Sequence, residues 1–161
     1  MTLTKSALIL GAVLLMSACT GAERFGAGGA DGTEAGAGGF GAGGVNDPNS
    51  PAFFSETIGD RVLFAVDQST ISPAAQSTLD AQANWLANNP AFTALIEGHA
   101  DEQGTSAYNL ALGARRASAV QNYLISMGVA PSRLKTISYG KERPIEICSD
   151  EACYSQNRRS V

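Results

Sequence analysis

The order of apolar and polar positions over residues 51–161 predicts three strands that alternate with two helices. Short runs rich in β-branched and aromatic residues are typical of strands, and they occur at 61–66, 92–97 and 135–139. Apolar residues at helical spacing fill the two stretches between these runs. This alternation predicts an α/β two-layer sandwich, with helices packed on a small mixed sheet and a βαβαβ core.

The first predicted helix has a recognisable start, face and end. Ser72 is a favourable N-cap residue, and Pro73 suits the first helical position. The pattern stops at Asn88, Asn89 and Pro90. We expect its buried face to consist of Ala75, Leu79, Ala83 and Leu86.

The second helical stretch covers residues 105–127 and contains Gly113. Glycine weakens a helix interior, so we expect a break at Gly113 between a short helix and a longer one. Gly128 follows where a left-handed residue often ends a helix. The expected buried stripe is Leu112, Val120, Tyr123, Leu124 and Met127.

Residues 19–50 differ in composition from the rest of the chain. They hold most of its 18 glycines and almost no aliphatic residue larger than alanine. Such a segment buries too little apolar surface to offset the entropy lost on ordering. We therefore expect three parts, which are a signal peptide at 1–18, a flexible tether at 19–50 and one folded domain at 51–161.

The amino terminus predicts export and lipid attachment. Lys5 precedes an apolar run at 7–16, which is too short to span a bilayer comfortably and is typical of a signal peptide. Residues 16–19, Met-Ser-Ala-Cys, resemble the lipobox of bacterial lipoproteins, and this implies acylation of Cys19. Thr20 in place of aspartate favours the outer membrane, with the domain in the periplasm. The alternative is a plain signal peptide followed by an incidental cysteine.

Charge and the other cysteines limit the partners. The net charge of −4 argues against nucleic-acid binding, which needs a basic face. Cys148 and Cys153 form an even pair in an oxidising compartment, so we expect a disulfide, with two free thiols or a metal pair as alternatives. Structural zinc needs four ligands, and the single histidine lies far away in sequence. No metal or cofactor is therefore expected.

The stretch Gly98–Arg116 gathers the candidate chemistry. Glu97, Asp101 and Glu102 could serve a periplasmic peptidoglycan hydrolase, but neighbouring acids do not naturally flank a sugar bond from opposite sides. His99 could act as a base, yet the sequence has no G-x-S-x-G nucleophile motif. We therefore interpret His99 as a structural hydrogen-bonding residue and do not expect an enzyme.

A binding site explains the same stretch better. Asp101 follows the second strand in a loop, and Arg116 lies on the helix that leads away from that loop. Both charges can then face one shallow cleft and bind a ligand with an ammonium and a carboxylate on one carbon. The alternatives are that Asp101 only caps a turn and that Arg116 is a solvated helix residue.

The motifs GHADEQGTSAYNLALGARRASAVQNYL, ISYGKERP and YSQNRR resemble the OmpA-like peptidoglycan-binding domain, most closely in the peptidoglycan-associated lipoproteins of the Tol-Pal system. The resemblance implies binding to the diaminopimelate residue of the stem peptide. It also implies that Asp101 and Arg116 are the principal ligand residues, that Asn109 shapes the site and that Arg158 approaches it. TolB and other Tol-Pal proteins are implied as partners, with a role in envelope integrity and cell division.

Overall fold

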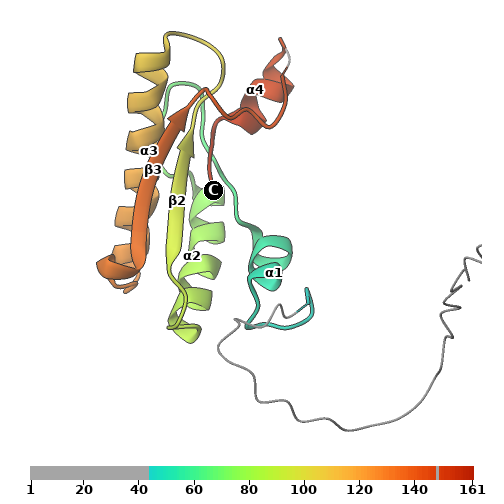
Figure 1. Cartoon of the computed structure of the whole chain (residues 1–161), viewed down its shortest axis with the longest axis vertical. Coiled ribbons are helices and arrows are strands. Elements are labelled where there is room, and N and C mark those ends of the chain that lie inside the picture. Colours follow the sequence, from blue (N-terminus) through green and yellow to red (C-terminus); the bar gives the residue numbers. More distant parts are fainter. Residues whose placement is uncertain (1–43, 148) are drawn as a thin grey trace, which may run out of the picture. The chain divides into compact units, whose positions relative to one another are not determined.

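The computed structural model describes residues 44–147 and 149–161 (Figure 1). The predicted signal peptide, Cys19, most of the predicted tether and Cys148 lie outside these residues. Residues 44–50, which the sequence assigns to the tether, contact the domain, because Trp85 Nε1 donates to the Pro48 carbonyl at 2.7 Å. The hydroxyl of buried Ser50 accepts from the Phe53 amide at the start of the first helix.

The predicted order of strands and helices is confirmed, with four short helical elements and a fourth strand added among the described residues. The elements are α1 (Pro51–Phe53), the π-helix η1 (Phe54–Gly59), β1 (Val62–Leu63), α2 (Pro73–Asn88), β2 (Ala94–His99), α3 (Ser106–Ser126), the 3-10 helix η2 (Pro131–Arg133), β3 (Leu134–Gly140), α4 (Glu151–Asn157) and β4 (Arg159–Ser160). Within the described residues, no helix has the length and apolar character needed to cross a membrane.

The sheet is mixed, as predicted, and its strand order is β1-β4-β2-β3. β2 and β3 are parallel neighbours, and α3 connects them and packs on both (Figure 1). β4 is antiparallel to β1 and to β2, and it lies between these two strands in the sheet. The two-layer α/β fold is therefore confirmed.

α2 forms as the sequence predicts. The Ser72 hydroxyl accepts from the Ala75 amide at 3.2 Å, and the helix ends at Asn88. Its predicted apolar face packs into the core against α3 and the sheet. The core residues that these elements share include Leu79, Leu86, Ile96, Val120, Leu124 and Leu134.

The prediction of a helix break at Gly113 is wrong, because α3 is continuous from Ser106 to Ser126. Gly113 is needed for close packing instead. A Cβ atom there would lie 2.4 Å from the Ser138 Oγ and 2.7 Å from the Gly98 carbonyl oxygen. Met127, expected in the buried stripe, is 47% exposed, whereas Gly128 has the expected left-handed φ of +97°.

The sign of one stability change separates the two interpretations of Gly113. On an open helix face, Gly113→Ala should stabilise by about 1 kcal/mol, because alanine favours the helix. The contacts with Gly98 and Ser138 predict the opposite, a loss of about 2 kcal/mol from overpacking. Urea unfolding of the domain measures this change.

Ser118→Ala is the matched control, since Ser118 is exposed on the same helix. We expect this variant to gain a few tenths of a kcal/mol. A stabilised Gly113→Ala variant would show that the close approach of α3 to the sheet has been misinterpreted.

Candidate functional site

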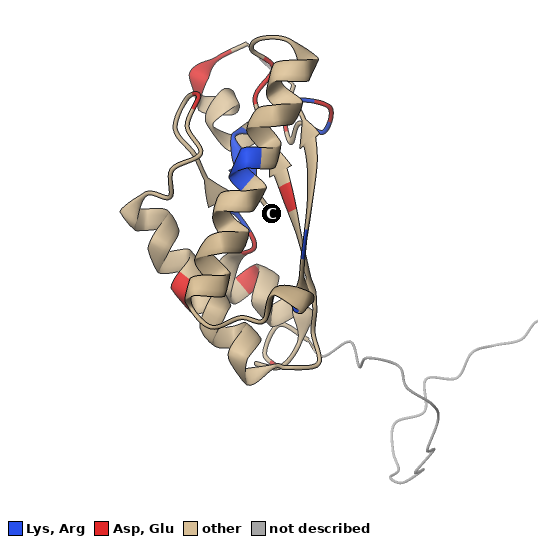
Figure 2. Ribbon diagram, turned by 90° about the vertical axis from the view of Figure 1, so that its left-hand side faces the viewer, with Lys and Arg blue, Asp and Glu red and all other residues tan. Residues whose placement is uncertain are grey.

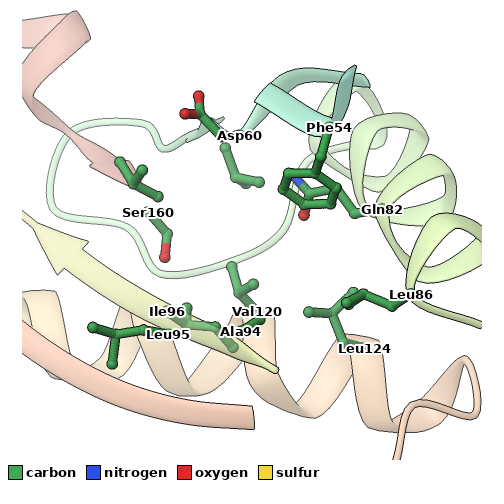
Figure 3. Close-up of a pocket in the computed structure, with 12 residues that line it drawn as sticks. Phe54, Asp60, Gln82, Leu86, Ala94, Leu95, Ile96, Val120, Leu124 and Ser160 are labelled. Atoms are coloured by element: carbon green, nitrogen blue, oxygen red, sulfur yellow. The ribbon is translucent and has the colours of Figure 1, made fainter. Parts of the chain in front are cut away.

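Among the pockets in the described part of the domain, two differ in character and in the predicted site residues that line them. One has a volume of about 60 Å³ and opens into the core, where Phe54, Leu86, Ile96 and Leu124 line it (Figure 3). The residues that line it include none of the predicted site residues. The other has a volume of about 220 Å³, and three predicted site residues, Asp101, Asn109 and Arg116, line it together. The second pocket is therefore the candidate site.

Arg116 is a wall of the site and also a structural residue. Its side chain is completely buried, with 0% exposure. The guanidinium donates to three backbone carbonyls, through Nε to Gln68 at 2.8 Å, Nη1 to His99 at 2.7 Å and Nη2 to Ala65 at 3.1 Å. The alternative that Arg116 is a solvated helix residue is thus wrong.

The charge of Arg116 persists in this environment. Burial lowers its pKa to about 10, and the nearby Asp101 carboxylate opposes that shift. The group therefore stays cationic at neutral pH. Because a guanidinium has five N–H donors, two remain after the three carbonyl bonds.

Asp101 is held from two sides. The residue is 8% exposed, and its Oδ2 accepts from Arg158 Nη1 at 3.1 Å while its Oδ1 accepts from the Gln103 amide at 3.2 Å. The second bond fits the turn-capping alternative, but the ion pair and the place in the pocket wall go beyond capping. Asp101 is thus an oriented carboxylate with part of its charge already compensated.

Arg158 contacts a pocket residue, Asp101, without lining the pocket itself. It is not among the pocket-lining residues, and it pairs with Glu151 of α4 as well as with Asp101. Burial alone would lower its pKa, but the hydrogen bonds and charges of Glu151 and Asp101 raise the pKa overall. Arg158 therefore fixes the orientation of Asp101 and ties α4 to the site.

Asn109 shapes the loop between β2 and α3. The side chain is buried, and its Nδ2 donates to the carbonyls of Asp101 at 3.2 Å and Gln103 at 2.7 Å. Gly104, with φ of +90°, lets this loop turn back toward α3. The amide thus holds the loop that presents Asp101.

Sequence reasoning missed three polar residues of the pocket, Asp67, Gln103 and Tyr108. The Tyr108 hydroxyl donates to the Asp67 carboxylate, and this hydrogen bond raises the pKa of Tyr108. Asp67 has a left-handed φ of +54°, which is uncommon for any residue but glycine and turns the chain sharply after β1. An aspartate directly after a strand was the available signal, but it indicated only a turn.

The three acids of the hydrolase alternative have separate surroundings. Only Asp101 is among the pocket-lining residues. A carboxylate oxygen of Glu97 lies 3.5 Å from His99 Nε2, and Glu102 accepts from the Asn157 side chain at 3.3 Å. Glu97, Asp101 and Glu102 therefore do not form the pair of facing carboxylates that glycoside hydrolysis requires.

Of the two cysteines in the predicted disulfide, only Cys153 lies in the part of the chain that the structure describes. Cys153 is buried on α4, whereas Cys148 lies outside the described residues. The pairing stays a prediction.

Acidic and basic residues are spread over helices, strands and loops rather than sorted by sign (Figure 2). Arg115 and Arg116 are adjacent in sequence but differ in burial. Arg115 is exposed and lies 5.8 Å from the centroid of the Tyr108 ring, whereas Arg116 is buried among backbone carbonyls.

This contrast gives a matched stability test. We expect Arg116→Ala to lower the free energy of unfolding by about 3 kcal/mol or more, because it leaves three carbonyls without their donor. Arg115→Ala should change it by less than about 0.5 kcal/mol. Chemical unfolding of both variants tests this expectation, and equal effects would contradict the structural role of Arg116.

The chain is similar in sequence to proteins named peptidoglycan-associated lipoprotein. The peptidoglycan-associated lipoprotein of Rhizobium meliloti is 55% identical over 114 residues, covering 71% of this chain and 65% of the relative. The protein of that name from Haemophilus influenzae is 38% identical over 157 residues, covering 98% of this chain and 95% of the relative. The chain thus matches just under two thirds of the length of the Rhizobium relative.

The fold of the chain is similar to that of solved structures. The crystal structure of the peptidoglycan-associated lipoprotein from Burkholderia pseudomallei is similar, with a TM-score of 0.64 at 40% identity, over 72% of this chain and 94% of that chain. The C-terminal domain of Helicobacter pylori MotB, at 23% identity, shares the fold. A model of the OmpA family matches residues 63–158, which is more than half of the chain. The chain therefore belongs to the OmpA family.

Proposed function

We propose that this protein is an outer-membrane lipoprotein that anchors the membrane to the cell wall by binding peptidoglycan non-covalently. The observation that carries the proposal is the pocket in which Asp101 and Arg116 meet. The names of the relatives support it, because they describe association with peptidoglycan and a lipoprotein. They name no reaction, so we assign no catalytic residue.

The ligand that fits the pocket is the end of the diaminopimelate side chain in a stem peptide. This group carries an ammonium and a carboxylate on one carbon. The two remaining N–H donors of Arg116 suit the carboxylate, and the acidic oxygens of Asp101 and Asp67 suit the ammonium. Each hydrogen bond to a charged group contributes roughly 1.5 to 3 kcal/mol, so a few bonds give useful and reversible binding.

The amino-terminal part supplies the membrane link in this proposal. Acyl groups on Cys19 hold the outer membrane, since several acyl chains together bind far more firmly than one. Residues 19–43, which precede the part that contacts the domain, would then give a reach on the order of 30 Å as a coil and up to roughly 90 Å when extended. The domain thereby reaches the wall from the membrane.

The Tol-Pal assignment belongs to the same proposal. TolB and other Tol-Pal proteins are the expected periplasmic partners, with a role in envelope integrity and cell division. A non-covalent grip can release and rebind, and it can therefore follow wall growth. Support for this assignment comes from the similarity to peptidoglycan-associated lipoproteins.

The ligand test uses an isosteric change. Asp101→Asn removes one negative charge from the pocket, and we expect it to weaken binding to a diaminopimelate-containing peptide about tenfold or more. Titration calorimetry with this peptide and its lysine counterpart measures the effect. The lysine peptide lacks the terminal carboxylate and should bind more weakly to the unmodified domain, because the donors of Arg116 lose their acceptor.

Glu56→Gln is the control, since Glu56 is exposed, is not among the pocket-lining residues and loses the same charge. Its affinity should stay unchanged. Equal affinity for the two peptides would contradict the assignment of diaminopimelate. Soluble muropeptides released from purified sacculi by the domain would instead favour the hydrolase alternative based on Glu97, Asp101 and Glu102.

The anchor has its own test. Cells that express the full chain should incorporate labelled palmitate into it, and Cys19→Ser should abolish the label and move the protein to the soluble periplasmic fraction. Incorporation that survives the substitution would show that Cys19 is not the acylated residue.

A further inference from the structure

His99 is buried without the hydrogen bonds that a structural histidine normally makes. It ends β2 and is 1% exposed. Neither ring nitrogen has a hydrogen-bond partner among the described residues, so the expectation of a hydrogen-bonding role for the ring is wrong. The ring packs beside Tyr139 of β3, with centroids 5.6 Å apart.

Burial and two nearby positive charges disfavour protonation of the His99 ring. Burial is the main cause, and the positive charges of Arg159 on β4 and Arg143 after β3 add to it, lowering the pKa of His99 to about 4. Glu97 on β2 is the facing acid, with Oε2 3.5 Å from Nε2. Arg143 is already engaged over the Tyr139 ring at 3.6 Å. The neutral imidazole is therefore the form that fits.

The backbone of the same residue forms part of the candidate site. The His99 carbonyl accepts from Arg116 Nη1 at 2.7 Å. The next residue, Ala100, donates its amide to the Gly140 carbonyl at 2.8 Å, and Asp101 then enters the pocket wall. A shift of the His99 ring would therefore move both charged groups of the pocket.

We propose that His99 is a positioning residue for the peptidoglycan site. Its ring, packed against Tyr139, fixes the end of β2, so that the His99 carbonyl holds Arg116, and Asp101 follows in register. This inference rests on the proposed function for the identity of the ligand. The coupling between His99 and Arg116 is a property of the domain alone.

Protonation of the ring should loosen this arrangement. The pKa of the folded state lies below the ordinary value of 6.5, so folding favours the neutral form. That stabilisation is complete above pH 6.5 and is lost as the pH falls toward 4. Between pH 7 and pH 5 the folding equilibrium constant should fall roughly 20-fold because of His99. The affinity for the peptide should fall over the range in which the folded ring titrates.

The experiment follows two NMR signals of the ligand-free domain across pH 7.5 to 3, so that the range includes the folded-state pKa of His99. One is the His99 ring Cε1–H, which reports protonation. The other is Arg116 Nε–Hε, whose donor bonds the Gln68 carbonyl. We expect both signals to change with the same midpoint, and peptide affinity, measured in parallel, to fall with them.

Two variants separate coupling from coincidence. Arg159→Met removes one of the charges that lower the pKa, so both midpoints should move upward together. His99→Phe removes the titrating group, and the Arg116 signal should then lose its shared transition. If the Phe ring does not fit, His99→Gln provides the same non-titrating test.

Three results would overturn the inference. They are an Arg116 signal that ignores the His99 titration, midpoints that separate in Arg159→Met, and a pH response that persists when His99 is replaced. Because the signals are recorded without ligand, these outcomes are independent of whether the domain binds diaminopimelate. Coupled signals without any peptide binding would contradict the proposed function and leave the coupling intact.

Discussion

The buried charge of Arg116 is the interaction on which the site depends. An unpaired charge inside a protein costs several kcal/mol, so the surrounding backbone must supply acceptors. The carbonyls of Ala65, Gln68 and His99 do so, and they come from two segments that are distant in sequence. β1 is shorter than the predicted strand at 61–66, since it ends at Leu63. After Leu63 the chain turns to face the guanidinium instead of continuing as the predicted strand.

Glycine packing places that guanidinium. Residues three or four apart share one face of a helix, so Asn109, Gly113 and Arg116 lie together on α3. The missing side chain at Gly113 lets α3 approach Gly98 of β2 closely. On this face, Asn109 holds the loop after β2, Gly113 permits the contact with β2, and Arg116 carries the charge. What appears in the sequence as a helix-weakening residue is a condition for the pocket.

Local signals predicted most of the fold, and non-local contacts account for part of the rest. α2 was predictable because its cap, its apolar face and its end lie within one stretch of sequence. β4 was not, since it depends on pairing with β1 and β2, far away along the chain. α4 was missed although it begins at a local N-cap, Asp150, whose side chain accepts from the Cys153 amide. For the site, Asp101 and Arg116 were found through motif resemblance. Arg158 was expected to approach the cleft, but its role as the ion-pair partner of Asp101 became visible only in the folded chain.

The charge arrangement also bears on how firmly the proposed ligand would be held. Arg158 already compensates part of the charge of Asp101, and three carbonyls already surround Arg116. Both groups are therefore fixed before a ligand arrives, which reduces the ordering cost of binding. The same contacts leave each group with only part of its bonding capacity. Such a pocket would favour specific recognition of a zwitterionic end group with limited affinity, which suits the proposed role of an anchor that releases and rebinds.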